Sequence, residues 1–150
     1  MSTAKQFNTA LRDWAEIFMT HSMREWVRFV KSSGLSMPQF STLMRLYYHG
    51  GCGISEISAH LDVTAPAASQ MVDRLVQTGL LERVEAPHDR RAKQVTLSAK
   101  GRDLIEKGIE ARNRWSEELT TKLTAEQRGI VVEALTFLTE AASKLDSKHE

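Results

Sequence analysis

The segment from Ile54 to Leu97 constrains the fold more than any other part of the chain. Its apolar residues first recur at the spacing of two short helices, which are separated by a tight turn at 62–64. Gly79 ends the second helix, and two short runs, 80–84 and 94–97, have the composition of β-strands. This order of elements predicts a helix-turn-helix followed by two paired strands.

The second helix of this segment, between a capping residue at Thr64 and Gly79, has two different faces. The face that we expect to be buried carries Ala68, Met71, Val72, Leu75 and Val76. The opposite face carries Pro66, Ser69, Gln70, Asp73, Arg74 and Gln77. Small and amide side chains suit a helix that lies in a DNA groove, because they can donate to and accept from base edges. The segment therefore predicts a DNA-reading helix.

The connection between the two strands, residues 85–93, is interpreted as a projecting loop. It contains three cations and no large apolar residue, so it has nothing to bury. The net charge of the chain is only +1, and contacts to phosphate must therefore depend on locally placed charge. We expect modest non-specific affinity and a shallow salt dependence. Between residues 89 and 102 five cations accompany the single anion Asp89: Arg90, Arg91, Lys93, Lys100 and Arg102.

A long amphipathic helix from about Ala4 to Ser32 precedes this segment. At about 1.5 Å per residue it would be roughly 40 Å long, which exceeds what a small domain can cover. We therefore expect its apolar stripe to contact a second subunit, and the alternative is an intramolecular core helix. The stripe consists of Phe7, Leu11, Trp14, Phe18, Met23, Trp26 and Val30.

Three further helices complete the predicted fold. One begins after the capping residue Ser36, a long one follows the capping residue Ser98, and the last opens on a capping box at 124–127. We expect a mainly α fold with a small two- to three-stranded β wing, in one compact domain. Residues 1–35 and 99–150 would form a helical dimerisation region, and residues 36–98 a winged helix-turn-helix region.

Composition excludes several other classes of protein. The apolar fraction of 41% supports a core. No apolar run approaches the ~18 residues of a membrane span, and the start of the chain lacks the apolar stretch of a secretion signal. The single cysteine, Cys52, cannot form an internal disulfide, so we expect a cytoplasmic location.

The strand and loop residues resemble the wing of the multiple-antibiotic-resistance regulator (MarR) family. That family's pattern is approximately G-L-x-x-R, then D-x-R, then L-T-x-x-G, and serine replaces the threonine here without loss of the hydroxyl. The helix order also matches along nearly the whole chain. The corresponding elements are Gly79-Leu80 with Arg83, Asp89 with Arg91, and Leu97-Ser98 with Gly101.

The resemblance implies a cytoplasmic homodimer that binds double-stranded DNA at a pseudo-palindromic operator and represses transcription. Arg91 would enter the minor groove, held by Asp89, with Arg90 and Lys93 beside it. The major-groove residues would be Thr64, Ala65, Pro66, Ser69, Gln70 and Arg74. An aromatic or amphipathic effector would bind near Trp14, Phe18, His21, Met44 and Tyr47, and the alternative is that these residues are dimer core.

Other functions have less support in the sequence. One alternative is that Cys52 senses oxidants, with His49 as its one neighbour in sequence able to stabilise a thiolate, and the other is that Cys52 is an incidental loop residue. The five histidines lack metal-ligand spacing, and we expect no metal and no cofactor. No nucleophile–base arrangement or phosphate-binding loop indicates an enzyme. A helical interaction protein without DNA binding is a further alternative, which the intact wing pattern argues against.

Overall fold

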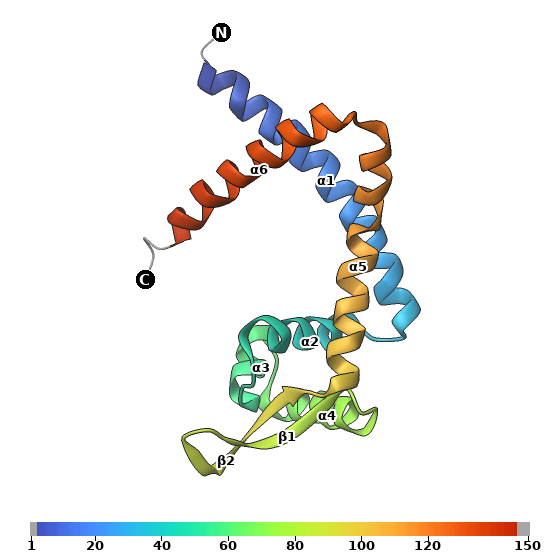
Figure 1. The fold of residues 1–150 in the computed structure, drawn as a ribbon. Helices are drawn as coiled ribbons and strands as arrows, with labels where there is room; N and C mark the ends of the chain where they lie inside the picture. The colour runs from blue at the N-terminus through green and yellow to red at the C-terminus, as the bar shows by residue number, and fades with distance from the viewer. Residues whose placement is uncertain (1–2, 147–150) are drawn as a thin grey trace. The chain divides into compact units, whose positions relative to one another are not determined.

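The computed structural model describes residues 3–146, with the side chains of residues 90–92 and 146 left out. Six helices and one two-stranded antiparallel sheet confirm the predicted fold class for this part of the chain (Figure 1). The elements are α1 (Thr3–Ser33), α2 (Met37–His49), α3 (Ile54–Leu61), α4 (Ala65–Gln77), β1 (Leu81–Ala86), β2 (Asp89–Leu97), α5 (Ala99–Lys122) and α6 (Ala125–Asp146).

The chain divides into two compact units, residues 1–113 and 114–150. The first contains α1 to α4, the β-hairpin and the beginning of α5, and the second contains the end of α5 and all of α6. The predicted division into dimerisation and DNA-binding regions concerns function, and it stays a prediction.

Side-chain caps define where several helices begin. Ser36 and Gln39 form a reciprocal capping box at α2, and Thr64 accepts a hydrogen bond from a backbone N–H of the first turn of α4. Before α6, the Thr124 N–H donates to the Gln127 side chain at 2.9 Å, and the Thr124 hydroxyl accepts from the Gln127 N–H at 3.2 Å. These bonds satisfy backbone donors that have no partner within the helix, and they confirm the predicted helix starts.

The core of the first unit lies where α2, α3, α4, the hairpin and α5 meet. The C-terminal part of α1 joins it through Trp26, whose ring packs edge-on against Phe40 with centroids 4.7 Å apart. Met71 and Val76, predicted to be buried, are only partly buried against this core. The most deeply buried apolar side chains are Phe40, Leu43, Leu46, Ile57, Ala68, Val72, Leu75, Leu81, Val95 and Ile105.

The hairpin is longer than predicted. Strands β1 and β2 are paired from Leu81↔Leu97 out to Ala86↔Asp89, with one irregularity in register between 85 and 86. The predicted loop over residues 85–93 is therefore wrong, because only 87 and 88 form the turn. Backbone hydrogen bonds hold paired strands together without an apolar face, so the polar sequence of this stretch did not exclude strand.

The base of the hairpin joins α4 to α5 at a point that we call the wing junction, residues 78–81 and 97–101. Gly79 has φ 75°, which turns the chain out of α4. The Ser98 hydroxyl donates to the Gly79 carbonyl at 2.5 Å and accepts from the Gly101 N–H at 3.0 Å. In addition, the Lys100 Nζ donates to the carbonyl of Thr78 at 2.9 Å. One serine thus connects the end of α4 with the start of α5.

Cys52 lies in the connection between α2 and α3, and its side chain is buried in the core. Its backbone pairs with that of Val95 through two hydrogen bonds, of 3.1 and 2.8 Å, and its side chain is buried. Burial raises the pKa of the Cys52 thiol, and a hydrogen bond with Arg45 lowers it by a smaller amount. The neighbour that the sequence indicated, His49, is exposed. This environment favours the protonated thiol and disfavours the oxidant-sensing alternative.

We predict that Gly101→Ala destabilises the fold by about 1–3 kcal/mol. A Cβ at this position would lie 2.1 Å from the carbonyl oxygen of Leu80, so the wing junction would have to open. Gly129→Ala is the matched control: it lies within α6 with nothing within 4 Å, and it should gain up to about 1 kcal/mol. Denaturant unfolding at one protein concentration measures both, and a Gly101→Ala protein as stable as wild type would contradict the close packing.

We predict that Cys52 is unreactive in the native protein at neutral pH. Because its pKa is raised, the thiolate fraction is smaller than that of a free cysteine at pH 7, and alkylation should accelerate only as the pH rises above the ordinary thiol range. The measurement is the rate of iodoacetamide labelling of native protein against protein unfolded in denaturant. Equal rates at pH 7 would show that the thiol is accessible and its pKa unperturbed.

Candidate nucleic-acid interface

Helix α4 presents the polar face that the sequence predicts. Ala68, Val72 and Leu75 are buried on one side. On the other side Ser69 is half-buried, and the remaining predicted major-groove residues are exposed: Thr64, Ala65, Pro66, Gln70 and Arg74. Contact of these residues with DNA stays a prediction.

The N-terminal tip of α4 is more apolar than predicted from the sequence. The side chain of Val63, in the turn before α4, is exposed, as are Ala65, Pro66 and Ala67. The hydroxyl of Thr64 is already used in capping, at 3.4 Å from the N–H of Ala67. Methyl groups at this tip can contact thymine methyl groups, whereas Ser69 and Gln70 can exchange hydrogen bonds with base edges. The sequence did contain a signal for Val63, because an apolar residue in a short polar turn has no core to pack against.

The wing residues lie on β2 and not in a loop. Asp89 and Lys93 are exposed. Arg90 and Arg91 have their backbone in β2, but their side chains lie outside the described residues. The predicted contact between Asp89 and Arg91 is therefore not described either.

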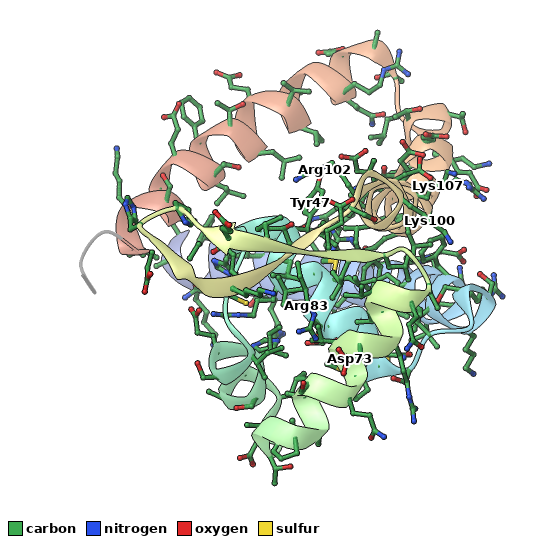
Figure 2. All side chains as sticks on the ribbon, turned by 90° about the horizontal axis from the view of Figure 1, so that it is seen from below. Tyr47, Asp73, Arg83, Lys100, Arg102 and Lys107 are labelled. Carbon is green, nitrogen blue, oxygen red and sulfur yellow. The ribbon has the colours of Figure 1, made fainter. Side chains whose placement is uncertain are left out.

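Several cations of the head are engaged within the molecule (Figure 2). Arg83, on β1, forms an ion pair with Asp73 on α4. The Arg102 guanidinium lies over the ring of Tyr47, 5.3 Å from its centroid, and Lys100 binds the end of α4. Two of the five cations expected to serve the wing thus also hold α5 to α4 and α2. Of the other three cations, Lys93 is exposed, and the side chains of Arg90 and Arg91 lie outside the described residues.

The residues predicted to bind an effector fall into two groups. The rings of Trp14 and Phe18 contact each other on α1, with centroids 6.3 Å apart. Met44 and Tyr47 lie on α2 against the core of the head. Trp14 precedes Trp26, the residue that packs on α2, by twelve residues, which is about 18 Å along the helix. An effector site that combines Trp14 and Phe18 with Met44 and Tyr47 stays a prediction.

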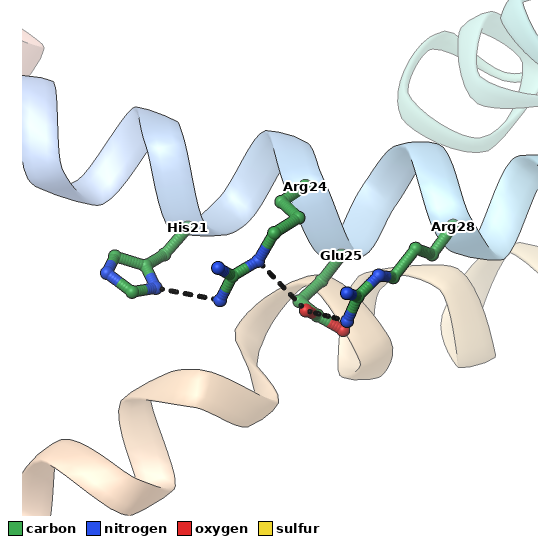
Figure 3. Close-up of polar contacts among 4 residues, drawn as sticks. All are labelled: His21, Arg24, Glu25 and Arg28. Carbon is green, nitrogen blue, oxygen red and sulfur yellow. Dashed lines mark hydrogen bonds and ion pairs between the residues drawn. The ribbon is translucent and has the colours of Figure 1, made fainter.

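His21 lies on α1 beside a row of charged side chains (Figure 3). Its Nδ1 is 3.3 Å from Arg24, and Glu25 forms ion pairs with Arg24 at 3.5 Å and Arg28 at 3.1 Å. His21 also lines a shallow groove on α1 with Asp13, Glu16, Ile17 and Thr20. Two carboxylates in this groove would repel an anionic aromatic acid.

Within residues 3–146 no helix is both long and apolar enough to cross a membrane. Among the described side chains, no three His, Cys, Asp or Glu residues are grouped so that they could hold a metal ion.

The chain is similar in sequence to known regulators. The family model described as "MarR family" matches residues 35–93. The uncharacterized HTH-type transcriptional regulator YfiV of Bacillus subtilis (strain 168) is 34% identical over 121 residues, which are 78% of this chain and 71% of YfiV. YdgJ and YwhA of the same organism are 25% and 34% identical over 73% and 55% of this chain. These matches span 66% and 60% of the length of those two regulators.

Solved structures share the fold. The transcriptional regulator Tm0710 from Thermotoga maritima has a TM-score of 0.78 and 28% identity, covering 95% of this chain and 98% of that one. MepR from S. aureus, solved with ethidium bromide and as a variant with an oligodeoxyribonucleotide, has a TM-score of 0.60 and 19% identity. Those matches cover 95% of this chain and 97% and 99% of the two MepR chains. The chain belongs to the MarR family of helix-turn-helix transcriptional regulators, and it is not an enzyme.

Proposed function

We propose that this regulator binds a pseudo-palindromic DNA operator as a homodimer and represses transcription. The observation that carries the proposal is the exposed polar face of α4, which is fixed beside the hairpin by the wing junction. A helix held in this way can enter a major groove while the hairpin lies over the adjacent minor groove. MepR, which has the same fold, has been solved with an oligodeoxyribonucleotide.

In this proposal the two elements read DNA differently. Ser69, Gln70 and Arg74 face base edges from α4, while the tip from Thr64 to Pro66 supports the helix in the groove. Arg91 enters the minor groove, where it senses groove width and potential. Asp89, Arg90 and Lys93 surround it on the wing.

We predict that Arg91→Ala weakens binding to the operator about tenfold. Lys107→Ala is the control, because it removes one positive charge from α5, where Lys107 pairs with Asp103 at 2.7 Å. Fluorescence anisotropy with a duplex from the regulator's own promoter region measures both at several salt concentrations. The wild-type slope should correspond to fewer than about ten released counterions per dimer. Equal losses in both variants would contradict the wing assignment.

The dimer is proposed from apolar side chains that the single chain leaves exposed. Phe7 on α1 is 50% exposed and Phe137 on α6 is 62% exposed. Exposed apolar area on this scale marks an interaction surface. We propose that a second copy of the chain covers the exposed apolar side chains of each helix. The other exposed large apolar residues on these two helices are Leu11, Trp14, Ile17, Phe18, Met19, Met23, Val27, Ile130, Val131, Val132, Leu135 and Leu145.

We predict that Leu135→Lys breaks the dimer. A lysine at this exposed position costs the separate chain little, but it would bury a charge in the proposed interface. Glu82→Lys is the control, because it introduces the same side chain at an exposed position of β1, outside both helices. Sedimentation velocity should show a dimer for wild type and the control, and a dissociation constant at least about 100-fold higher for Leu135→Lys. A monomeric wild type at micromolar concentration would contradict the proposal.

An effector is proposed to act on the spacing of the two heads. A compound that binds one spacing more tightly than the other shifts the population towards it. An aromatic or amphipathic compound fits the apolar side chains Trp14 and Phe18, with His21 beside them and Met44 and Tyr47 on α2. MepR was solved with ethidium bromide, a compound of this type.

A further inference from the structure

Asp73 is placed where an anion should hinder DNA binding. It follows Ser69 by four residues and Gln70 by three, so it shares their exposed face of α4. In the proposed complex this carboxylate lies close to phosphates, which it would repel. The structure gives it a cationic partner, because the Arg83 guanidinium donates a hydrogen bond to the Asp73 carboxylate.

Arg83 reaches Asp73 from the core-facing side of the hairpin. In an antiparallel pair, opposed residues point to the same face, and alternate residues of one strand do so as well. Arg83 is paired with Val95 and lies two residues after Leu81, and both of these side chains are buried. Arg83 therefore lies on the same face of the hairpin as these buried residues, at the edge of the core. Its long side chain reaches from β1 to Asp73 on α4.

The ion pair is a second attachment between the wing and the recognition helix. The first attachment is the wing junction, at the base of the hairpin. A turn that lies about 20 Å from that base moves by several ångströms when the base rotates slightly. Two backbone hydrogen bonds with Cys52 hold β2 at Val95, opposite Arg83, to the segment before α3. The ion pair adds a side-chain contact from β1 to α4 itself, which limits rotation of the hairpin relative to that helix.

We propose that Asp73 and Arg83 are positioning residues for DNA binding, whose ion pair sets the angle of the wing relative to α4. The proposal rests on the proposed function. The alternative is that Arg83 binds a DNA phosphate directly. In that case the effect of substituting Arg83 would not depend on Asp73. The pair is of little importance to stability, because its side chains are 38% and 54% exposed and such pairs contribute little.

The test uses two substitutions that change charge in opposite directions, Asp73→Asn and Arg83→Gln. If the pair positions the wing, both variants bind the operator about three- to tenfold more weakly, and the double variant is no weaker than the weaker single one. If the two side chains act only through their charges, Asp73→Asn binds more tightly than wild type, and the double variant returns towards wild-type affinity. That second pattern would overturn the proposal.

The exposed pair Asp103 and Lys107 on α5 supplies the matched control. Asp103→Asn and Lys107→Gln remove the same types of charge from a pair 2.7 Å apart on a single helix. We expect both to bind as wild type does. A further arm combines Asp73→Asn with Arg91→Ala, because loss of wing position should matter little once the wing contact is gone. Full additivity of these two changes would also contradict the proposal.

Hydrogen exchange without DNA separates the inference from the proposed function. The amides of 83–94 should exchange several-fold faster in Asp73→Asn and in Arg83→Gln, while those of α4 keep their wild-type rates. Unchanged exchange in the hairpin would overturn the positioning role. If the wild-type protein bound no duplex, the proposed function would fail, and the exchange rates would still show whether the pair holds the wing.

Discussion

The hydrogen bonds of Ser98 hold together the wing junction, where α4, the hairpin and α5 meet. The Ser98 hydroxyl donates to the carbonyl of Gly79, just after α4, and accepts from the N–H of Gly101 in the first turn of α5. The close approach of Gly101 to Leu80 leaves no room for a side chain between the two segments. Because α4, the hairpin and α5 meet at this point, the junction fixes α4 relative to the base of the hairpin, and the Asp73–Arg83 ion pair is proposed to set the angle of the wing.

Local sequence signals predicted most of the fold. The caps at Ser36, Thr64 and Thr124 act within one helical turn, and the two faces of α4 follow from helical periodicity alone. These features depend on residues that are three or four positions apart. They can therefore be read without knowing which distant segments meet, and the structure confirms them.

Features that depend on distant partners were not predictable in the same way. The polar stretch 85–93 is strand because its backbone pairs across the hairpin, and side-chain composition carries little of that information. Cys52 is buried because it pairs with Val95 far along the chain. Arg83 matches a family pattern, but its partner Asp73 is identifiable only when β1 lies on α4.

The small net charge of the chain gives these positioning contacts their importance. A strongly basic protein gains affinity from many phosphate contacts, and each tolerates some displacement. Here Arg83 is paired with Asp73 and the net charge is +1, so little attraction is available for contacts that are out of place. In the proposed complex, binding then depends on a few groups that must reach their grooves together. A wing that is also held to α4 by the Asp73–Arg83 ion pair would reduce the entropy that such binding costs.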